Sequence, residues 1–229
     1  MKGCLLFALG IPAGLLILAV VVFRLNFYDV HVRYRLTVEV QDGDQLKTGS
    51  SVVEALYDIQ PTWSWSGPGN YTRVVGYAPT VDLGDKGLLF LSFSNATPTP
   101  EERARWSVYF CGADSMYCLP FEAYGQRDVR THYYDREASL KTLLRQSGPR
   151  DVPFVALPKL ARFRNGDDPR LLVHVSPDNL AATFGPGVEL KRVVLQLTDD
   201  PVSPMPETWP QWLKQAGQEE GTLKGYRED

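Results

Sequence analysis

The side chains best suited to acid–base chemistry or metal binding in this chain are its three histidines, His31, His132 and His174. His132 lies in the sequence THYYDRE close to Asp135, so this pair is the candidate site of a hydrolase without a recognised motif. His174 alternates with apolar residues, a pattern typical of a hydrogen-bonded histidine in a core or at a sheet edge. His31 follows a long apolar segment by a few residues, which suits an interfacial position better than a catalytic one.

Aromatic side chains gather in PTWSWSGPGNYTR, residues 61–73, and form the candidate ligand-binding site. Trp63 and Trp65 have the same parity in the sequence, so they are expected to project from one face, next to a loop rich in Gly and Pro. Together with Tyr71 they combine apolar area with polar groups, which suits a sugar or a partner protein. The alternative is that the tryptophans cap a core beneath a long loop.

Two cysteines, Cys111 and Cys118, lie close together in YFCGADSMYCLPF. The turn-forming residues Gly112, Asp114 and Ser115 between them are expected to bring the two sulfurs together. In an oxidising compartment the pair would form a short-loop disulfide, and the alternative is two buried free thiols.

Common catalytic and metal-binding motifs are absent from the sequence. It contains no G-x-S-x-G, G-x-x-x-x-G-K-[ST], H-E-x-x-H or C-x-x-C motif, and no dinucleotide fingerprint. Residues 165–168 (Asn-Gly-Asp-Asp) resemble a fragment of a calcium loop without the rest of its spacing, so they and residues 199–201 are interpreted as turns. No catalytic residue, metal ligand or cofactor is therefore assigned, and an interaction or structural role is favoured over an enzyme.

Composition narrows the function classes further. The chain has 229 residues with 24 Lys+Arg and 27 Asp+Glu, a formal net charge of -3, which argues against nucleic-acid binding through phosphate neutralisation. A hydrophobic fraction of 44% with 22% charged residues is ordinary for a folded protein. No internal repeat or long linker divides the chain after residue 25, which predicts one folded domain.

The twenty residues Cys4–Phe23 form an apolar run without a charge, bracketed by Lys2 and Arg24. A helix of this length, at about 1.5 Å per residue, spans the roughly 30 Å hydrocarbon core of a bilayer. The alternative is a cleaved secretory signal, which has a shorter apolar region followed by a small-residue cleavage site. Because the run is longer and ends in VVVFRLNF, we expect a retained single membrane anchor.

The sequence gives weaker signals for the side of the membrane on which the body of the chain lies. Arg24, Arg33 and Arg35 give a slight bias toward a cytoplasmic body, but long domains translocate largely regardless of such charges. The paired cysteines favour an oxidising compartment. N-x-T triplets at Asn70 and Asn95 would matter only in a eukaryotic secretory pathway. We therefore expect the body of the chain on the extracytoplasmic side.

Hydrophobic periodicity predicts the elements that position these residues. Arg33–Val40 alternates between apolar and polar residues, and a turn at 42–44 separates it from a second extended run at Ser51–Ile59, so the two are expected to pair as a hairpin. Further strands are expected at Tyr71–Leu83 and Leu88–Phe93. Because the second of these is apolar on both faces, a central place in a sheet or between layers is expected.

Helices are expected in the second half of the chain. After Asp135, an apolar stripe and an i,i+4 pair predict a helix that stops at Gly148-Pro149. A second helix is expected to start with Ser176 as its N-cap and to end at Gly185. The expected stripe comprises Ala138, Leu140, Leu143 and Leu144; strands are expected at Leu171–Val175 and Val188–Thr198, and a last short helix at Thr208–Ala216.

The predicted fold class is α+β: one N-terminal transmembrane helix followed by a mainly antiparallel β domain with a few short helices. The predicted organisation is a membrane anchor at residues 1–24, a single globular domain at 25–216 and a disordered polar tail at 217–229.

Three stretches carry a resemblance to a known family: YRLTVEV with GSSVVE, VDLG at Val81–Gly84, and SPDNLAATFGPGVELKRVVLQLTDDPV at Ser176–Val202. The chain resembles an uncharacterised family of small, single-span, membrane-anchored bacterial proteins. The resemblance implies a location in the bacterial inner membrane and favours an envelope protein. It implies no activity and no catalytic residues.

The leading hypothesis is a membrane-anchored envelope protein whose domain binds another protein or has a structural role. The first alternative is a glycan or cell-wall binding module that uses Trp63, Trp65 and Tyr71. The second alternative is a hydrolase with a site around His132 and Asp135. The expected partners are the membrane and an envelope protein or glycan, and nucleic acid is not expected.

Overall fold

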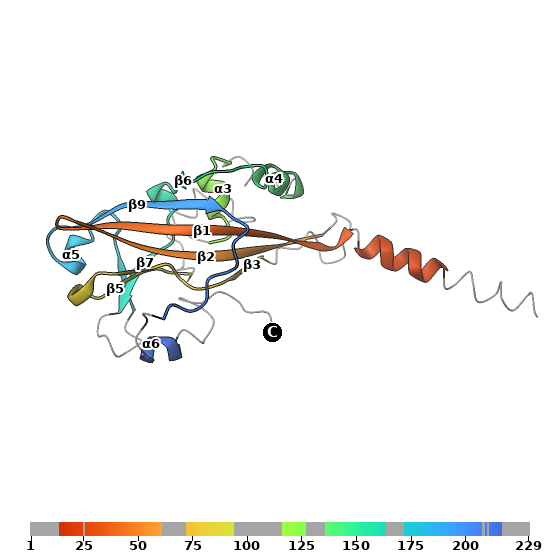
Figure 1. Cartoon of the computed structure of the whole chain (residues 1–229). Coiled ribbons are helices and arrows are strands. Elements are labelled where there is room, and N and C mark those ends of the chain that lie inside the picture. Colours follow the sequence, from red (N-terminus) through yellow and green to blue (C-terminus); the bar gives the residue numbers. More distant parts are fainter. Residues whose placement is uncertain are drawn as a thin grey trace, which may run out of the picture.

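The structure is a computed structural model, and it describes residues 14–24, 26–60, 72–93, 116–126, 136–163, 172–207, 209 and 211–216. After an N-terminal helix at residues 14–24, strands and short helices follow one another along the chain (Figure 1). The strands are β1 Tyr28–Asp42, β2 Gln45–Ile59, β3 Thr72–Val75, β4 Thr80–Asp82, β5 Leu88–Leu91, β6 Arg150–Asp151, β7 Leu160–Phe163, β8 Leu172–Val175 and β9 Val188–Leu197. The α-helices are α3 Leu119–Ala123, α4 Arg136–Leu143, α5 Ala181–Phe184 and α6 Gln211–Ala216, with 3-10 turns at η1 Gly84–Lys86 and η4 Phe154–Ala156.

A long hairpin of β1 and β2 forms the centre of the fold. Asp42 pairs with Gln45 across a two-residue turn in which Gly43 has a φ of 57°, a conformation that glycine adopts without strain. The predicted alternation is confirmed, because the even-numbered β1 residues from Val32 to Val40 are at most 1% exposed. At about 3.3 Å per residue each strand is roughly 50 Å long, and Figure 1 shows the hairpin running along most of the domain.

The hairpin belongs to a five-stranded sheet with the order β3-β2-β1-β9-β6, in which every pairing is antiparallel. A register shift between Glu39 and Val40 marks a bulge in the β1–β9 pairing. Next to it, the Arg192 guanidinium donates hydrogen bonds of 2.8 and 3.0 Å to both carboxylate oxygens of Glu39.

A second, four-stranded sheet with the order β4-β5-β7-β8 is also antiparallel. It lies against β2, and the two approach closely at Gly49, where an added Cβ would lie 1.9 Å from the carbonyl oxygen of Thr80. The predicted central place of β5 is confirmed, since it pairs with β4 and β7. Leu89 and Leu91 belong to the main core between the sheets, and Phe90 belongs to a second, smaller core.

Helix α3 closes the main core beside the hairpin. Phe121 is 1% exposed and meets the Tyr57 ring edge-on at 5.9 Å. The Tyr34 hydroxyl donates a 2.5 Å hydrogen bond to the Met116 carbonyl, and the Tyr57 hydroxyl donates one to the Tyr117 carbonyl. Burial raises the pKa of Tyr34 well above its usual value, so the group stays a hydrogen-bond donor at neutral pH.

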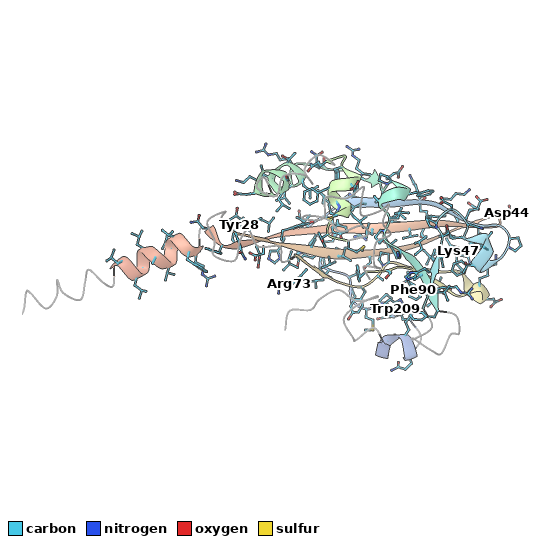
Figure 2. All side chains as sticks on the ribbon, turned by 180° about the vertical axis from the view of Figure 1, so that it is seen from behind. Tyr28, Asp44, Lys47, Arg73, Phe90 and Trp209 are labelled. Atoms are coloured by element: carbon cyan, nitrogen blue, oxygen red, sulfur yellow. The ribbon has the colours of Figure 1, made fainter. Side chains whose placement is uncertain are left out.

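The C-terminal segment crosses the edge of β2 and covers the second sheet. Ser203 exchanges backbone hydrogen bonds with Val52, donating to its carbonyl and accepting from its amide through the side-chain hydroxyl. Trp209, 2% exposed, donates from Nε1 to the Thr80 hydroxyl at 3.1 Å and meets Phe90 edge-on (Figure 2). The predicted C-terminal helix is present as α6, beginning three residues later than expected, and its Leu213 is fully buried.

The N-terminal helix projects away from the domain (Figure 1). Its apolar side chains from Leu15 to Phe23 are exposed on all sides, with values from 44 to 67%. It joins β1 through a tight connection in which the Phe27 amide donates to the Phe23 carbonyl at 2.9 Å and the two rings stack at 4.3 Å. Within the described residues, which include 14–24 of this segment, no helix has the length and apolar character of a membrane span.

The α+β class with mainly antiparallel sheets is confirmed, whereas three local predictions are wrong. The expected strand at 71–83 is two strands in different sheets, β3 and β4, separated at Gly76, whose φ is 131°. Ser176 is no N-cap, because Ser176–Asn179 forms a turn and the Asn179 carboxamide accepts from the Ala182 amide at the start of α5. In the expected apolar stripe of α4, Leu140 and Leu143 are buried, whereas Ala138 is exposed and Leu144 is 52% exposed.

Candidate functional site

A pocket of about 380 Å³ lies beside β1, where β9 ends. Among the described residues its lining comes from four elements. β1 contributes its open edge, β2 contributes one carboxylate, and the segments at the ends of α4 and β9 form the two sides. The lining residues are His31, Val32, Arg33, Glu54, Leu144, Gln146, Leu197, Thr198 and Asp199. The volume is within the range of about 300–1,000 Å³ that is usual for binding pockets.

The pocket exists because β9 is shorter than β1. β9 ends at Leu197, opposite Tyr34, whereas β1 begins at Tyr28 and pairs with β2 along its whole length. The last bond on the β9 side is donated by the Thr198 amide to the Arg33 carbonyl at 3.1 Å. Successive residues of a strand direct their backbone groups to opposite edges, so those of His31 and Asp29 point to the same edge as those of Arg33. In the described chain, no backbone partner faces them there.

A charged pair borders this edge on the outer face of the sheet. Arg33 and Glu54 are direct cross-strand partners, and Arg33 Nε donates to Glu54 Oε1 at 2.7 Å. His31 Nδ1 lies 3.5 Å from the same oxygen. The Glu54 side chain is 12% exposed, whereas those of His31 and Arg33 are 49% and 43% exposed. The Glu54 carboxylate therefore holds the Arg33 guanidinium in place, and the outer parts of the His31 and Arg33 side chains stay accessible.

Helix α4 places an apolar side chain at the pocket. Leu140 and Leu143 are buried in the main core and anchor the helix, which leaves Leu144 at its end exposed toward the pocket. At its other end, Glu137 accepts hydrogen bonds from Lys141 and from the Tyr28 hydroxyl, and both lower the pKa of the carboxyl. Burial and the nearby Glu137 raise the pKa of Tyr28. These contacts tie α4 to the start of β1, so the pocket wall is held at both ends.

The turn after β9 closes the opposite side of the pocket. The Thr198 hydroxyl donates to Asp200 at 2.8 Å, and Arg35 pairs with the same carboxylate at 2.7 Å. Both interactions lower the pKa of Asp200. Asp199 is exposed at the pocket, and its carboxylate has no hydrogen bond or ion pair with the part of the chain that the structure describes. Asp200 lies at a bend, where its amide donates to the Thr198 hydroxyl, and Asp199 supplies an acid without a partner among the described residues.

The predicted ligand-binding residues Trp63, Trp65 and Tyr71 lie outside the described residues. The residues that flank this segment belong to the same end of the sheet as the N-terminal helix, because Ile59 pairs with Tyr28. His132 and Asp135 also lie outside the described residues. The glycan and hydrolase hypotheses therefore stay predictions.

Cys118 is disulfide-bonded, and it is 3% exposed at the start of α3. Cys111 lies outside the described residues, so its pairing with Cys118 stays a prediction. His174 is exposed on β8, an edge strand of the second sheet. Of the two positions that the sequence allowed, a core or a sheet edge, it takes the edge. Within the described ranges, no cluster of three or more His, Cys, Asp or Glu side chains could hold a metal ion.

Comparison with known proteins finds no matching family model, no matching curated protein and no matching solved structure. The pocket itself is therefore the main guide to function. Its groups can form hydrogen bonds with an extended backbone, contact an apolar side chain and bind a charge. Sequence reasoning missed Arg33, Glu54, Leu144 and Asp199 as site residues, because the only signal was the unequal length of two strands that are distant in the sequence.

Proposed function

We propose that the chain is a single-span protein of the bacterial inner membrane that holds its domain on the periplasmic side, where the domain binds another protein. The observation that carries the proposal is the N-terminal helix, whose apolar side chains are exposed on every face. A helix that is apolar all round is stable only when it is surrounded by protein or lipid. The sequence continues this apolar character back to Cys4, which gives the run the length of a span.

The disulfide at Cys118 supports the periplasmic side. Disulfides persist in oxidising compartments and are rare in the cytosol, where thiols are kept reduced. The disulfide outweighs the slight charge bias of Arg24, Arg33 and Arg35, and the family resemblance supports the inner-membrane location.

Binding is favoured over catalysis by the composition of the pocket. Its one hydroxyl among the described residues, that of Thr198, donates to Asp200, whose carboxylate is also paired with Arg35. Its accessible groups instead offer hydrogen bonds and charge at an open strand edge. Because the edge begins a few residues after the N-terminal helix, a partner would meet it close to the membrane surface.

Topology and partner binding are tested separately. For topology, membranes are extracted with alkaline carbonate, and alkaline phosphatase and green fluorescent protein are fused after Asp229. We expect the full-length chain in the membrane fraction, with an active phosphatase fusion and a dark fluorescent one. Protein in the aqueous fraction, or the opposite fusion pattern, would contradict the proposal.

For partner binding, a photoreactive amino acid is introduced in place of Leu144 at the pocket, and a matched variant carries it in place of Leu46, an exposed residue near the distal end of the hairpin. We expect protein adducts from the Leu144 position that are absent from the Leu46 position. Equal labelling at both positions, or none, would count against a binding role of this pocket. Adducts with cell-wall fragments would instead support the glycan alternative.

A further inference from the structure

We infer that the open edge of β1 binds an extended segment of the partner protein, which adds to the five-stranded sheet as a short strand in line with β9. This inference rests on the proposed binding function and names the partner's form. The segment would lie between β1 and the end of α4, inside the pocket described above.

The backbone of β1 supplies the main recognition groups. The N–H and C=O groups of His31 and Asp29 face the edge that β9 leaves open, while the intervening Val30 and Val32 direct theirs to β2. Exposed strand edges of this kind are templates for a further strand, and proteins normally cover or shorten them. Here the other side of β1 is fully paired, so the edge is rigid before a partner arrives.

The side chains around the edge select an alternating sequence. On the inner face, Val32, Leu144 and Leu197 line the pocket and favour an apolar side chain. On the outer face, Arg33 is paired with Glu54. Beyond the end of β9, Asp199 lines the pocket and has no partner within the described residues. The pocket lining includes one guanidinium, that of Arg33, and two carboxylates, those of Glu54 and Asp199, so a Lys or Arg fits near Asp199. The expected segment therefore alternates apolar and polar residues and carries a basic residue at the Asp199 end.

A partner segment is favoured over a second copy of this chain by symmetry. Two copies anchored in one membrane are related by an axis along the membrane normal, so their β1 strands would run parallel to each other. The antiparallel pairing used by every strand of this sheet would then be impossible between them. The Thr198–Asp199 segment borders the pocket at the end of β9, in line with which the added strand would lie.

The test uses the full-length chain in lipid nanodiscs and, as the probe, a phage-displayed library of random nine-residue peptides, with empty nanodiscs for counter-selection. We expect enriched peptides with alternating apolar residues and a basic residue. One enriched peptide is then synthesised in three forms: unmodified, and N-methylated on either alternate set of residues. One methylated set should lose binding about tenfold or more and the other should retain it, because only one edge of the peptide faces β1.

Protein variants provide the matched comparison. His31→Pro removes the N–H that faces the open edge and leaves the β1–β2 hydrogen bonds in place, whereas His31→Ala keeps that N–H. We expect about a tenfold loss of peptide affinity for His31→Pro and less than about a twofold change for His31→Ala. Asp199→Asn should weaken peptides with a basic residue more than their neutral versions.

The inference is wrong if no peptide is enriched, or if binding is equally tolerant of both methylated sets. It is also wrong if His31→Cys chains crosslink to one another in high yield in membranes, because a second copy would then occupy the edge. These outcomes are independent of the proposed function, since the domain could still face the periplasm and bind a partner elsewhere. The methylated peptides keep the test decisive even if His31→Pro fails to fold.

Discussion

Replacement of Gly49 by alanine tests the contact that joins the two sheets. A Cβ at this position would lie 1.9 Å from the Thr80 carbonyl oxygen and 2.9 Å from the Val81 amide nitrogen, both backbone atoms. Because ordinary contacts begin at 3.4 Å, β2 and β4 would have to separate by about 1.5 Å over residues that are buried in the core. Overpacking usually costs 1–3 kcal/mol, and a clash with backbone cannot be relieved by a rotamer change, so we expect a loss of about 4 kcal/mol.

For a chain of this length, a loss of about 4 kcal/mol lowers the melting temperature by roughly 8–16 °C. The measurement is thermal unfolding of the full-length protein in detergent micelles, followed by tryptophan fluorescence. Ser50→Ala is the matched control, since Ser50 is the exposed neighbour whose hydroxyl accepts only a surface hydrogen bond from Thr37, and it should melt within about 2 °C of the parent. A Gly49→Ala protein as stable as this control would refute the close packing of β2 on β4.

The remaining predictions concern other parts of the domain. Trp209→Ala removes a buried ring and its hydrogen bond to Thr80, which should weaken docking of the C-terminal segment by about 3–5 kcal/mol. Trypsin should then cleave after Lys214 faster than in the parent. Unchanged cleavage would refute the docking. Hydrogen bonding from Lys86 lowers the pKa of Asp42 below its usual 3.8. The ionised Asp42 carboxylate therefore stabilises the fold above about pH 3.8, and this stabilisation is lost as the pH falls through the lowered pKa. Asp42→Asn should therefore show a shallower fall in melting temperature below about pH 4 than the parent, and parallel curves would contradict this. Reductant should lower the melting temperature of the parent and leave Cys118→Ser unchanged, because disulfides stabilise by about 2–5 kcal/mol; an equal response of both proteins would exclude a role of Cys118.

The local parts of the fold could be predicted from the sequence. The β1–β2 hairpin follows from strict alternation on both sides of a turn that contains a glycine with positive φ. The central place of β5 follows from apolar residues on both faces, since Leu89 and Leu91 enter one core and Phe90 the other. In both cases the pattern depends on neighbours within a few residues, which a sequence displays directly.

The long-range pairings could not be predicted in this way. β9 pairs with β1 although about 150 residues separate them, and neither strand carries a signal that identifies the other. Likewise, residues 71–83 have the pattern of one strand, and that pattern does not show the break at Gly76, where φ is 131° and an added Cβ would lie 3.0 Å from Val53 and 3.3 Å from Val202. The start of α5 was misplaced because the Asn179 side chain caps it, although Ser176 and Pro177 form a better local signal.

In the candidate site, too, local features could be predicted from the sequence, whereas long-range ones could not. The interfacial position expected of His31 stays a prediction, and the structure places His31 in β1, a few residues after the N-terminal helix. Its place in a pocket depends on β9 ending opposite Tyr34, which is a property of register. The exposure of Leu144 has a different cause: Leu140 and Leu143 already occupy the core-facing side of α4.

The tight connection between the N-terminal helix and β1 has a mechanical consequence. The Phe23 and Phe27 rings stack, and the Phe27 amide donates to the Phe23 carbonyl, so with the N-terminal segment in lipid, as proposed, the hairpin would tilt together with that segment. Transmembrane helices tilt by about 20° on average, and the tilt grows when the bilayer thins. Over a hairpin of roughly 50 Å, such a tilt displaces the distal tip at Asp44 sideways by about 17 Å, so bilayer thickness would set where that tip points (Figure 2).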